Sequence, residues 1–363
     1  MKIKPALIAL FICCLCTNAF AQNKFKKLND WMDENALDMG GRAILLIYQN
    51  GKVAHSYSVN NMNLRQKLAG RMIAKRQGKT SDADDYTADS RVAIASCSKW
   101  LSAALVMTYI DEGKLKLTDT VGKFLPLIAA GGKGKITVAQ CLSHQTGIKA
   151  PPLKEGLQEM RNISSMDEAI KNIAGMPLEG EPGKVFHYSN VGLQIAGAVV
   201  EKISGKTFRA AFAERIATPL DMGNTDWGEG KIPLPAGSAI STPHDYLNFL
   251  TMILNKGTFG GKRILSEASI AQMQINRITP DVKVAYAPGE AGDLGYGFGE
   301  WVNKGATAAK PGNSVSSPGL FGSYPWVDYN RNYAAFLMTF YVKNKGRGER
   351  YKELKKLVDE VVP

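Results

Sequence analysis

The sequence predicts an α/β (α+β) protein. One lobe, a sheet with flanking helices, is built from both ends of the chain, and an all-helical lobe is inserted between them. This follows from strand patterns at both ends of the chain and helical patterns in the middle. Loops that contain glycine and proline separate the helical patterns. The composition agrees, because 45% of the 363 residues are hydrophobic and 21% are charged. Such values are typical of a globular protein and exclude a disordered or collagen-like chain.

The first 21 residues have the pattern of a secretory signal peptide. Lys2 and Lys4 precede an apolar run over 6–16, and the small residues around Ala21 predict cleavage there. A membrane anchor needs roughly 18–20 apolar residues, and neither this run nor any later stretch is that long. We therefore predict an exported protein, periplasmic or secreted, with a mature chain of 22–363 and no integral membrane segment after cleavage.

Three of the five cysteines lie in this leader. A lipid anchor on one of them is an alternative to simple cleavage, but large residues precede each one where small residues are expected. Cys97 and Cys141 remain, too few for a disulfide framework. A single bridge between them and two buried free thiols are both open, and we favour the free thiols.

The chain carries a formal net charge of +12, of which the two leader lysines contribute two. A diffuse excess of this kind suits anionic surroundings, but no basic helix or nucleic-acid-binding module accompanies it, so nucleic acid is not a predicted partner. The segment 60–80 contains six basic residues and no acidic one, and 81–89 contains four aspartates. These opposite blocks are typical of an exposed, self-neutralising loop, with binding of an anionic ligand as the alternative.

The individual elements follow from hydrophobic spacing. A hairpin is predicted over 42–48 and 53–57, because Asn50-Gly51 supplies the positive φ angles of a tight turn. Further strands are predicted at 296–302, 324–327 and 333–340. A final helix places one apolar face on Tyr351, Leu354, Val358 and Val361. The remaining helices are predicted at 96–110, 137–143, 165–173, 191–203, 207–217, 243–254 and 266–274.

The first chemical signal is Ser96-Cys97-Ser98-Lys99, the one S-x-x-K in the sequence. A spacing of three places both side chains on one helix face. A lysine can remove the proton of a serine once burial or neighbouring cations lower its pKa from about 10.4 to about 7. Two fixed positions also match by chance, so an ordinary amphipathic helix is the alternative.

A second signal is Tyr188-Ser189-Asn190. Two other Y-x-N triplets occur, but one lies in the hairpin turn and the other inside a helical pattern. Tyr188 lies in a loop before a helix, where a phenol near lysine cations can act as base or proton shuttle and Asn190 can hold a substrate carbonyl oxygen. A third signal is the 317–322 loop before a strand, where Gly319 allows substrate close to the backbone and the next amide can face an oxyanion.

These motifs, in this order, resemble the serine β-lactamase and penicillin-binding-protein superfamily, in particular its class C β-lactamase-like branch of serine hydrolases. That branch, with its carboxylesterases and D-amino-acid peptidases, combines S-x-x-K, Y-x-N and a K-T-G or H-x-G element on a strand. The resemblance covers nearly all of the mature chain, because the segments at 111–119, 141–147, 236–238 and 241–245 also agree. It implies a β-lactamase-like fold, with an antiparallel sheet lobe of about 22–110 and 290–363 and a helical lobe of about 111–289.

The same resemblance implies roles for single residues. Ser96 would be the acylated nucleophile, Lys99 its base partner, Tyr188 the proton shuttle and Asn190 a substrate contact. The backbone amides of Ser96 and Leu320 would form the oxyanion hole.

The third motif departs from the family pattern. Gly319 and Ser317 are predicted substrate-binding positions, but Ser317 stands where the family has Lys, His or Trp. The departure disfavours substrates that need a cation to hold a carboxylate, unless another cation such as Lys310 or Arg71 replaces it. Esters have no such requirement.

Other candidate sites are weaker. The four histidines lack the G-x-S-x-G elbow of a Ser-His-Asp hydrolase, and we expect His144 and His187 to brace loops near the site. No histidine pair has metal-site spacing, and the glycine-lysine segments at 131–135 and 205–207 lack a complete phosphate-loop pattern. Neither a metal nor a cofactor is predicted.

The sequence thus predicts an exported serine hydrolase that cleaves a small-molecule ester, amide or peptide through an acyl-enzyme on Ser96. One alternative is a β-lactamase or D-alanyl carboxypeptidase that acts on cell-wall material. Another is a non-catalytic or slowly deacylating sensor or scaffold of the same fold.

Overall fold

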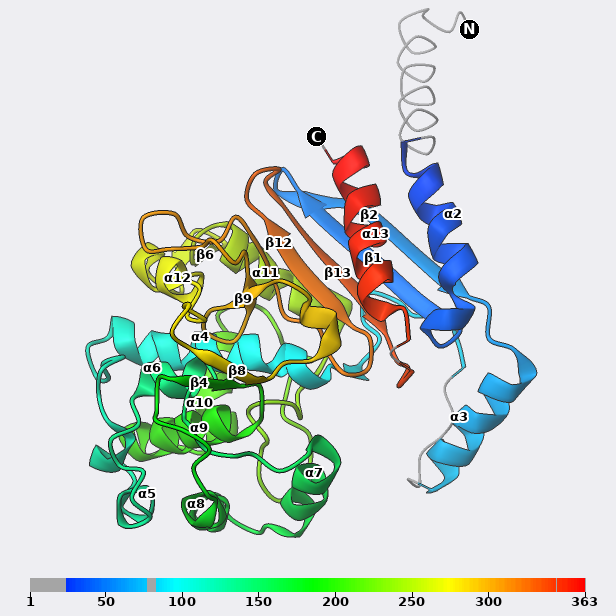
Figure 1. Ribbon diagram of the computed structural model, residues 1–363. Coiled ribbons are helices and arrows are strands. Elements are labelled where there is room, and N and C mark those ends of the chain that lie inside the picture. The colour runs from blue at the N-terminus through cyan, green and yellow to red at the C-terminus, as the bar shows by residue number, and fades with distance from the viewer. Residues whose placement is uncertain (1–23, 77–82, 344, 363) are drawn as a thin grey trace, which may run out of the picture.

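A seven-stranded sheet joins the two ends of the chain (Figure 1). The computed structural model describes residues 24–76, 83–343 and 345–362, so the predicted signal peptide lies outside the described residues. The strand order is β2-β1-β13-β12-β11-β10-β9, and the neighbouring strands pair antiparallel. The strands are β1 (Arg42–Gln49), β2 (Lys52–Asn60), β9 (Gly295–Tyr296), β10 (Trp301–Val302), β11 (Ser314–Ser316), β12 (Tyr324–Asp328) and β13 (Tyr333–Thr339).

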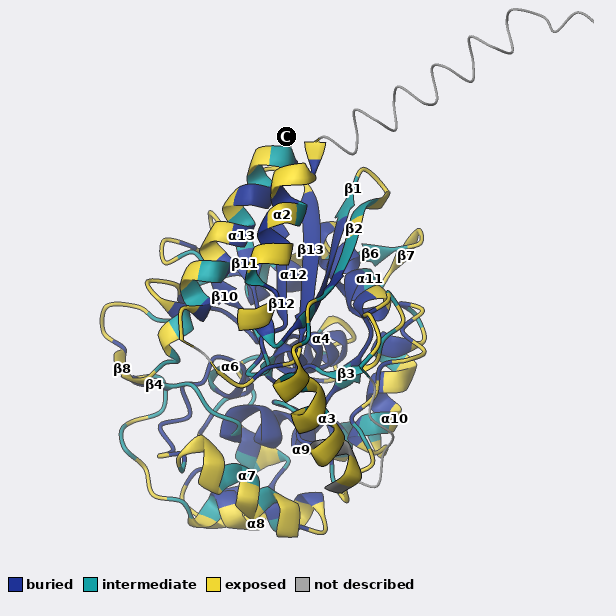
Figure 2. Ribbon diagram, turned by 90° about the vertical axis from the view of Figure 1, so that its right-hand side faces the viewer, coloured by how far each residue is buried: buried dark blue, intermediate teal, exposed yellow. Residues whose placement is uncertain are grey.

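Helices cover both faces of this sheet and fill the rest of the molecule (Figures 1 and 2). They are α2 (Lys26–Asn35), α3 (Leu64–Arg76), α4 (Ser98–Asp111), α5 (Pro126–Ala130), α6 (Val138–Leu142), α7 (Leu153–Asn162), α8 (Met166–Gly175), α9 (Val191–Ser204), α10 (Phe208–Phe212), α11 (Pro243–Leu254), α12 (Glu267–Met273) and α13 (Arg347–Val361). Short strand pairs lie among the helices. They pair β3 (Val92–Ala93) with β5 (Ile240–Ser241), β4 (Val185–His187) with β8 (Lys283–Tyr286), and β6 (Thr258–Phe259) with β7 (Lys262–Arg263).

The continuous apolar run of β1 is explained by burial of both sheet faces. Ala43, Leu45 and Ile47 pack with α2 and α13, whereas Ile44 and Leu46 pack in the larger core on the other face. Successive side chains of a strand point to opposite faces, so a strand buried on both sides is apolar at every position. The predicted hairpin and the mixed fold class are therefore confirmed.

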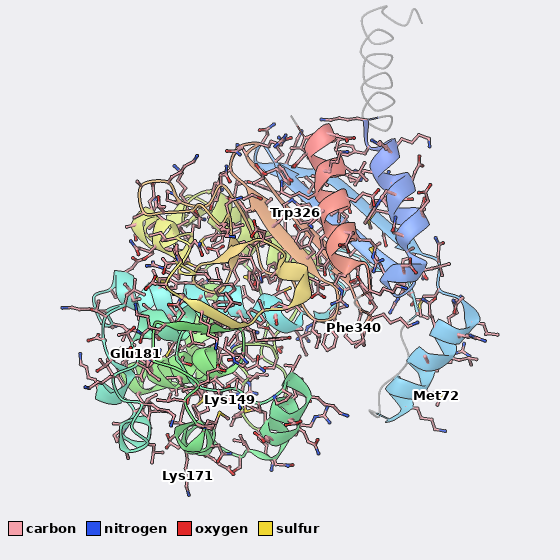
Figure 3. All side chains as sticks on the ribbon, in the orientation of Figure 1. Met72, Lys149, Lys171, Glu181, Trp326 and Phe340 are labelled. Atoms are coloured by element: carbon pink, nitrogen blue, oxygen red, sulfur yellow. The ribbon has the colours of Figure 1, made fainter. Side chains whose placement is uncertain are left out.

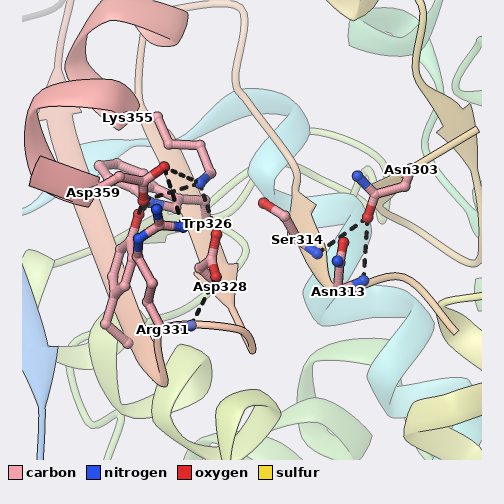
Figure 4. A network of polar contacts seen from close by, with 9 residues as sticks. Asn303, Asn313, Ser314, Trp326, Asp328, Arg331, Lys355 and Asp359 are labelled. Atoms are coloured by element: carbon pink, nitrogen blue, oxygen red, sulfur yellow. Dashed lines mark hydrogen bonds and ion pairs between the residues drawn. The ribbon is translucent and has the colours of Figure 1, made fainter. Parts of the chain in front are cut away.

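The C-terminal helix α13 is held on the sheet by apolar packing and a polar network (Figure 4). Lys355 donates to Asp328 at 2.7 Å and to Asp359 at 2.8 Å, which links α13 to β12. Asp359 also accepts from the Tyr333 hydroxyl at 2.7 Å, and Tyr333 accepts from the Trp326 indole at 2.8 Å. The predicted apolar face of this helix is confirmed, because Tyr351, Leu354 and Val358 are buried.

On the opposite face of the sheet, α11 packs against β1, β12 and β13. Its predicted bounds are confirmed, and the Thr242 side chain caps its first turn by accepting from the Asp245 amide. The predicted helical lobe includes 243–254, and the helix over these residues packs against the sheet. The bounds of the two lobes themselves stay a prediction.

One predicted loop is wrong, because Leu64–Arg76 forms the helix α3. This helix projects from the body of the protein (Figure 1) and has exposed residues along it (Figure 2). A capping box begins it: the Gln66 amide donates to the Asn63 side chain at 2.9 Å, and the Asn63 amide donates to the Gln66 side chain at 2.8 Å. The segment is also rich in strong helix formers. Met72, labelled in Figure 3, is 59% exposed.

Several short elements were not predicted, among them α2, α5, α7 and the strand β11. The predicted strand at 296–302 is two strands, β9 and β10, joined by a turn. Cys97 and Cys141 are both free and buried, as expected. Within the described ranges, no helix is long and apolar enough to cross a membrane.

Candidate active site

The S-x-x-K motif lies where a tight turn enters the central helix α4. Ala95, Ser96 and Cys97 form a 3₁₀ turn, and Ala95 has a φ of +46°, a left-handed conformation that larger branched residues adopt at a cost. The Ser98 hydroxyl donates to the Ala95 carbonyl and accepts from the Ala239 amide at 3.1 Å. These contacts fix Ser96 at the start of the helix.

Lys99 is buried because α4 is surrounded by protein from Ser98 to Tyr109. Its ammonium nitrogen Nζ lies 3.0 Å from the Ser96 hydroxyl oxygen and 2.8 Å from the Ala236 carbonyl oxygen. It also lies 3.4 Å from the Asn190 amide oxygen and 4.8 Å from the centre of the Tyr188 ring. The structure therefore brings together the four residues that the first two motifs predict.

Burial lowers the pKa of Lys99 to about 7, because a charged ammonium is poorly solvated inside the protein. A neutral amine beside Ser96 has the lone pair that a general base needs. Burial raises the pKa of the Cys97 thiol, so this neighbour is not a competing thiolate nucleophile at neutral pH.

Tyr188 lies in an aromatic cluster beside Ser96 and Lys99. Its ring stacks on Trp301 at 5.3 Å between centroids and contacts His144 at 4.7 Å. Burial raises the pKa of the Tyr188 phenol, and a hydrogen bond with Ser96 offsets only part of this increase. The phenol is therefore protonated at neutral pH, which favours a shuttle over the phenolate base that the sequence also allowed.

We expect Tyr188→Phe to lower kcat by about 10²–10³, in the lower part of the range for general acid–base catalysis, since Lys99 retains the first proton transfer. The phenylalanine ring preserves the stacking on Trp301. Steady-state ester hydrolysis checks this. Tyr48→Phe is the control, because Tyr48 starts another Y-x-N but lies in β1. Tyr246→Phe is not a control, because its hydroxyl donates to the Cys97 carbonyl at 2.8 Å. Equal losses at Tyr188 and Tyr48 would contradict the assignment.

Asn190 and the Ala236 carbonyl complete the surroundings of Lys99. The Asn190 oxygen accepts from Lys99, which leaves its amide nitrogen as a donor for a substrate carbonyl. Ser102 holds the chain next to Ala236 by donating to the Pro235 carbonyl at 2.6 Å. The sequence did not predict that a backbone carbonyl binds the lysine.

The third motif packs directly on the nucleophile turn. A Cβ atom on Gly319 would lie 2.3 Å from the Ile94 carbonyl oxygen, so glycine is required here for close backbone packing. The sequence analysis attributed this glycine to substrate approach. The Gly319 amide donates to the Ser323 carbonyl at 2.8 Å, whereas the Leu320 amide has no hydrogen-bond partner in the described part of the chain. Leu320 therefore offers a free amide for an oxyanion.

The predicted substrate-binding role of Ser317 gains no support. Ser317 is buried, and its hydroxyl donates to the Gly299 carbonyl at 2.9 Å and to the Ser96 carbonyl at 3.5 Å. It does not line the cavity that contains Ser96, although Pro318, Gly319 and Leu320 do. Its hydroxyl holds the backbone near the nucleophile instead of facing a substrate.

Arg347 is a residue of the site that sequence reasoning missed. Its buried guanidinium donates to the Leu320 carbonyl at 2.9 Å and to the Tyr341 hydroxyl at 3.3 Å. It also pairs with Glu290 at 3.4 Å and donates to the Lys343 carbonyl at 3.2 Å. Arg347 thus fixes the Leu320 peptide, and its donors are engaged by the protein.

A cavity of about 610 Å³ opens onto Ser96, Lys99, Tyr188 and Asn190. Its cationic lining residues are Lys99, Lys149 and Arg347, and it is not lined by Lys310 or Arg71, the two cations proposed from the sequence. Lys149, labelled in Figure 3, comes from the loop before α7. It is exposed and has no ion pair among the described residues.

The two histidines brace loops, as expected. The His144 ring lies 3.1 Å from the Tyr296 hydroxyl and accepts from the Ser189 amide at 3.4 Å. His187 pairs with Glu179 at 2.6 Å. Across the described ranges, no cluster of three His, Cys, Asp or Glu side chains has a geometry that could hold a metal ion.

Known proteins are similar to this chain in sequence and in fold. The family model described as Beta-lactamase matches residues 40–359. The chain belongs to the β-lactamase family. Among solved structures, a candidate β-lactamase from Bacteroides dorei is 27% identical with a TM-score of 0.75, covering 93% of this chain and 98% of that chain.

Two other similar proteins are named for different activities. EstCE1, a hydrolase with promiscuous acyltransferase activity, is 20% identical with a TM-score of 0.72, covering 93% of this chain and 99% of that one. The D-alanyl-D-alanine-carboxypeptidase/endopeptidase AmpH of Escherichia coli K12 is 23% identical over 278 residues, which is 69% of this chain and 71% of AmpH. The predicted superfamily and fold are confirmed.

Proposed function

We propose that this β-lactamase family member is a serine hydrolase that cleaves an ester or amide bond through an acyl-enzyme on Ser96. The observation that carries the proposal is the contact between Ser96 and Lys99. Burial lowers the pKa of this lysine to about 7. Such a lysine costs stability, and the described chain gives it no carboxylate partner. Its chemical use as a base explains why it lies there. On the leader pattern, we also propose that the protein is exported.

The proposed reaction proceeds in two steps. Neutral Lys99 takes the proton of the Ser96 hydroxyl as its oxygen attacks the substrate carbonyl carbon, and the Ser96 and Leu320 amides stabilise the oxyanion. Tyr188 passes a proton to the leaving oxygen or nitrogen as the bond between this atom and the carbonyl carbon breaks. Water then attacks the acyl-enzyme, loses its proton to the same groups, and releases the acid and free Ser96.

We expect esters to be better substrates than β-lactams. Ser317 is buried and the donors of Arg347 are occupied, so neither is available to hold a substrate carboxylate. A charge-assisted hydrogen bond contributes about 1.5–3 kcal/mol, against about 1 kcal/mol for a neutral one. The kcat/KM for p-nitrophenyl butyrate should therefore exceed that for a chromogenic cephalosporin by about tenfold or more. A preference for the cephalosporin would contradict the esterase proposal.

The second candidate function is a β-lactamase or D-alanyl carboxypeptidase, and Lys149 is the observation that favours it. This exposed cation lines the cavity and has no acidic partner in the described part of the chain. If it holds a carboxylate, Lys149→Met should lower kcat/KM about tenfold for a D-alanyl dipeptide or cephalosporin but less than twofold for a neutral ester. Equal effects on both classes would remove this support.

A third possibility is a sensor or scaffold that acylates without turnover. A fluorophosphonate probe that labels Ser96 separates an enzyme from an inert scaffold. Continued product release after the first turnover then separates a hydrolase from a sensor.

A further inference from the structure

The cavity beside Ser96 is much larger than a short acyl group, and its two ends differ in chemistry. Ser96, Lys99, Tyr188 and Asn190 line the polar end. Away from them, the walls are mainly aliphatic side chains of α7, α8 and the loops beside them: Leu153, Met160, Ile163, Ala169, Ile173 and Met176. A cavity of about 610 Å³ lies in the size range that encloses drug-sized ligands.

The helix α7 forms an outer wall of this cavity and has little packing of its own. None of its ten residues is buried, and Leu153 at its start is 47% exposed. Leu153, Gly156 and Met160 follow a helical spacing of three and four, so one face of α7 is turned to the cavity. In Figures 1 and 2, α7 lies beside α8, whose buried Ala169 and Ile173 contribute the facing wall.

We propose that the substrate is an ester with a large hydrophobic substituent, which occupies the space between α7 and α8. This inference rests on the proposed hydrolase function and specifies its substrate class. With a short substrate, the aliphatic walls stay in contact with water. When a long alkyl or aryl substituent binds in the cavity, its own apolar surface and the apolar surface of Leu153 and Met160 are both removed from water. The hydrophobic effect makes this burial favourable.

A chain-length series tests the substrate class. Initial rates are measured for p-nitrophenyl acetate, butyrate, hexanoate, octanoate and decanoate, each below the concentration at which it aggregates. A second series varies the alcohol of a butyrate ester, because either side of the ester bond can carry the substituent. In one of the two series, kcat/KM should rise about two- to fourfold for each added methylene. The fourfold limit corresponds to about 0.8 kcal/mol per buried CH₂. A maximum at two to four carbons in both series would overturn the inference.

A variant that fills the cavity tests its location. A Cβ atom on Gly156 would have one neighbour within 4 Å, the Pro151 ring at 3.4 Å, so a larger side chain fits there. Phenylalanine also forms helix better than glycine. In the series in which kcat/KM rises with length, Gly156→Phe should lower the ratio of kcat/KM for the eight-carbon ester to that for the two-carbon ester at least tenfold. Gln158→Phe is the matched control, because Gln158 is an exposed residue of α7 that does not line the cavity. An unchanged ratio in Gly156→Phe, or an equal fall in both variants, would overturn the proposed location.

Calorimetric titration of Ser96→Ala separates the two levels of the proposal. In one of the two series, this variant should bind the eight-carbon ester at least tenfold more tightly than the two-carbon ester without turning either over. Equal affinities in both series would refute the hydrophobic substituent whether or not the wild-type protein is a hydrolase. Tighter binding of the longer ester, combined with no ester turnover by the wild type, would refute the esterase function and retain the ligand class.

Discussion

Ser96→Ala should abolish labelling by a fluorophosphonate probe and lower kcat by about 10⁴ or more, the scale seen when a serine nucleophile is removed. The serine hydroxyl is the atom that would form the acyl bond, and no other group of the site can replace it. Cys97, the adjacent nucleophile, is fully buried, and burial raises the pKa of its thiol.

The variant should stay folded, because Ser96 is only half-buried and its side chain hydrogen-bonds only to the site residues Lys99 and Tyr188 among the described residues. Mass spectrometry of the labelled protein and its melting temperature check both statements. Ser189→Ala is the matched control, since Ser189 also lines the cavity and is not buried. Labelling of Ser96→Ala at the wild-type rate would show that the nucleophile is a different residue.

Lys99→Met should have the second largest effect, a loss of about 10³–10⁴ in kcat, in the upper part of the range for general acid–base catalysis. The thioether fills most of the buried space but cannot accept the proton of Ser96. Lys133→Met is the control. Lys133 is also buried and donates to the Ala174 carbonyl at 2.7 Å, but it does not line the cavity. Retention of more than a tenth of wild-type activity in Lys99→Met would rule out Lys99 as the base.

The wild-type pH profile should identify the same group. Because the neutral form of Lys99 is the active one and its pKa is about 7, kcat/KM should be low at pH 5, rise through about pH 7 and level off above pH 8. A profile that is already flat from pH 5 upward would contradict this role.

Stability should change with pH in the same direction as activity. The pKa of Lys99 is about 7 in the folded protein, against the ordinary 10.5 of an unfolded lysine. The unfolded chain therefore binds more protons between these values, and the free energy of unfolding rises with pH across this window. From pH 9 to pH 7, the wild type should lose about 2 kcal/mol relative to Lys99→Met, since one pKa unit corresponds to 1.36 kcal/mol. Urea unfolding of both proteins at the two pH values measures this difference, and parallel changes would refute the buried, neutral lysine.

The features that the sequence alone determined are those set by neighbouring residues. The turn at Asn50-Gly51 predicted the first hairpin, and hydrophobic spacing predicted the bounds of α11. The order of the S-x-x-K and Y-x-N motifs predicted the β-lactamase family. It also singled out Ser96, Lys99 and Tyr188, which the structure brings into contact. The helix α3 was not predicted, although its capping box is formed by neighbouring residues.

Only the tertiary structure decided how this site is tuned, because the deciding contacts join residues far apart in the chain. The pKa of Lys99 depends on burial by surrounding helices, and one of its acceptors is the carbonyl of Ala236. The burial of Ser317 and the hold of Arg347 on Leu320 likewise need the packed fold. The cavity is lined both by Ser96 and by residues of α7 and α8, which lie far from Ser96 in the chain. No local sequence pattern predicts such a cavity, because its volume is the space that the side chains of many elements leave unfilled when they pack.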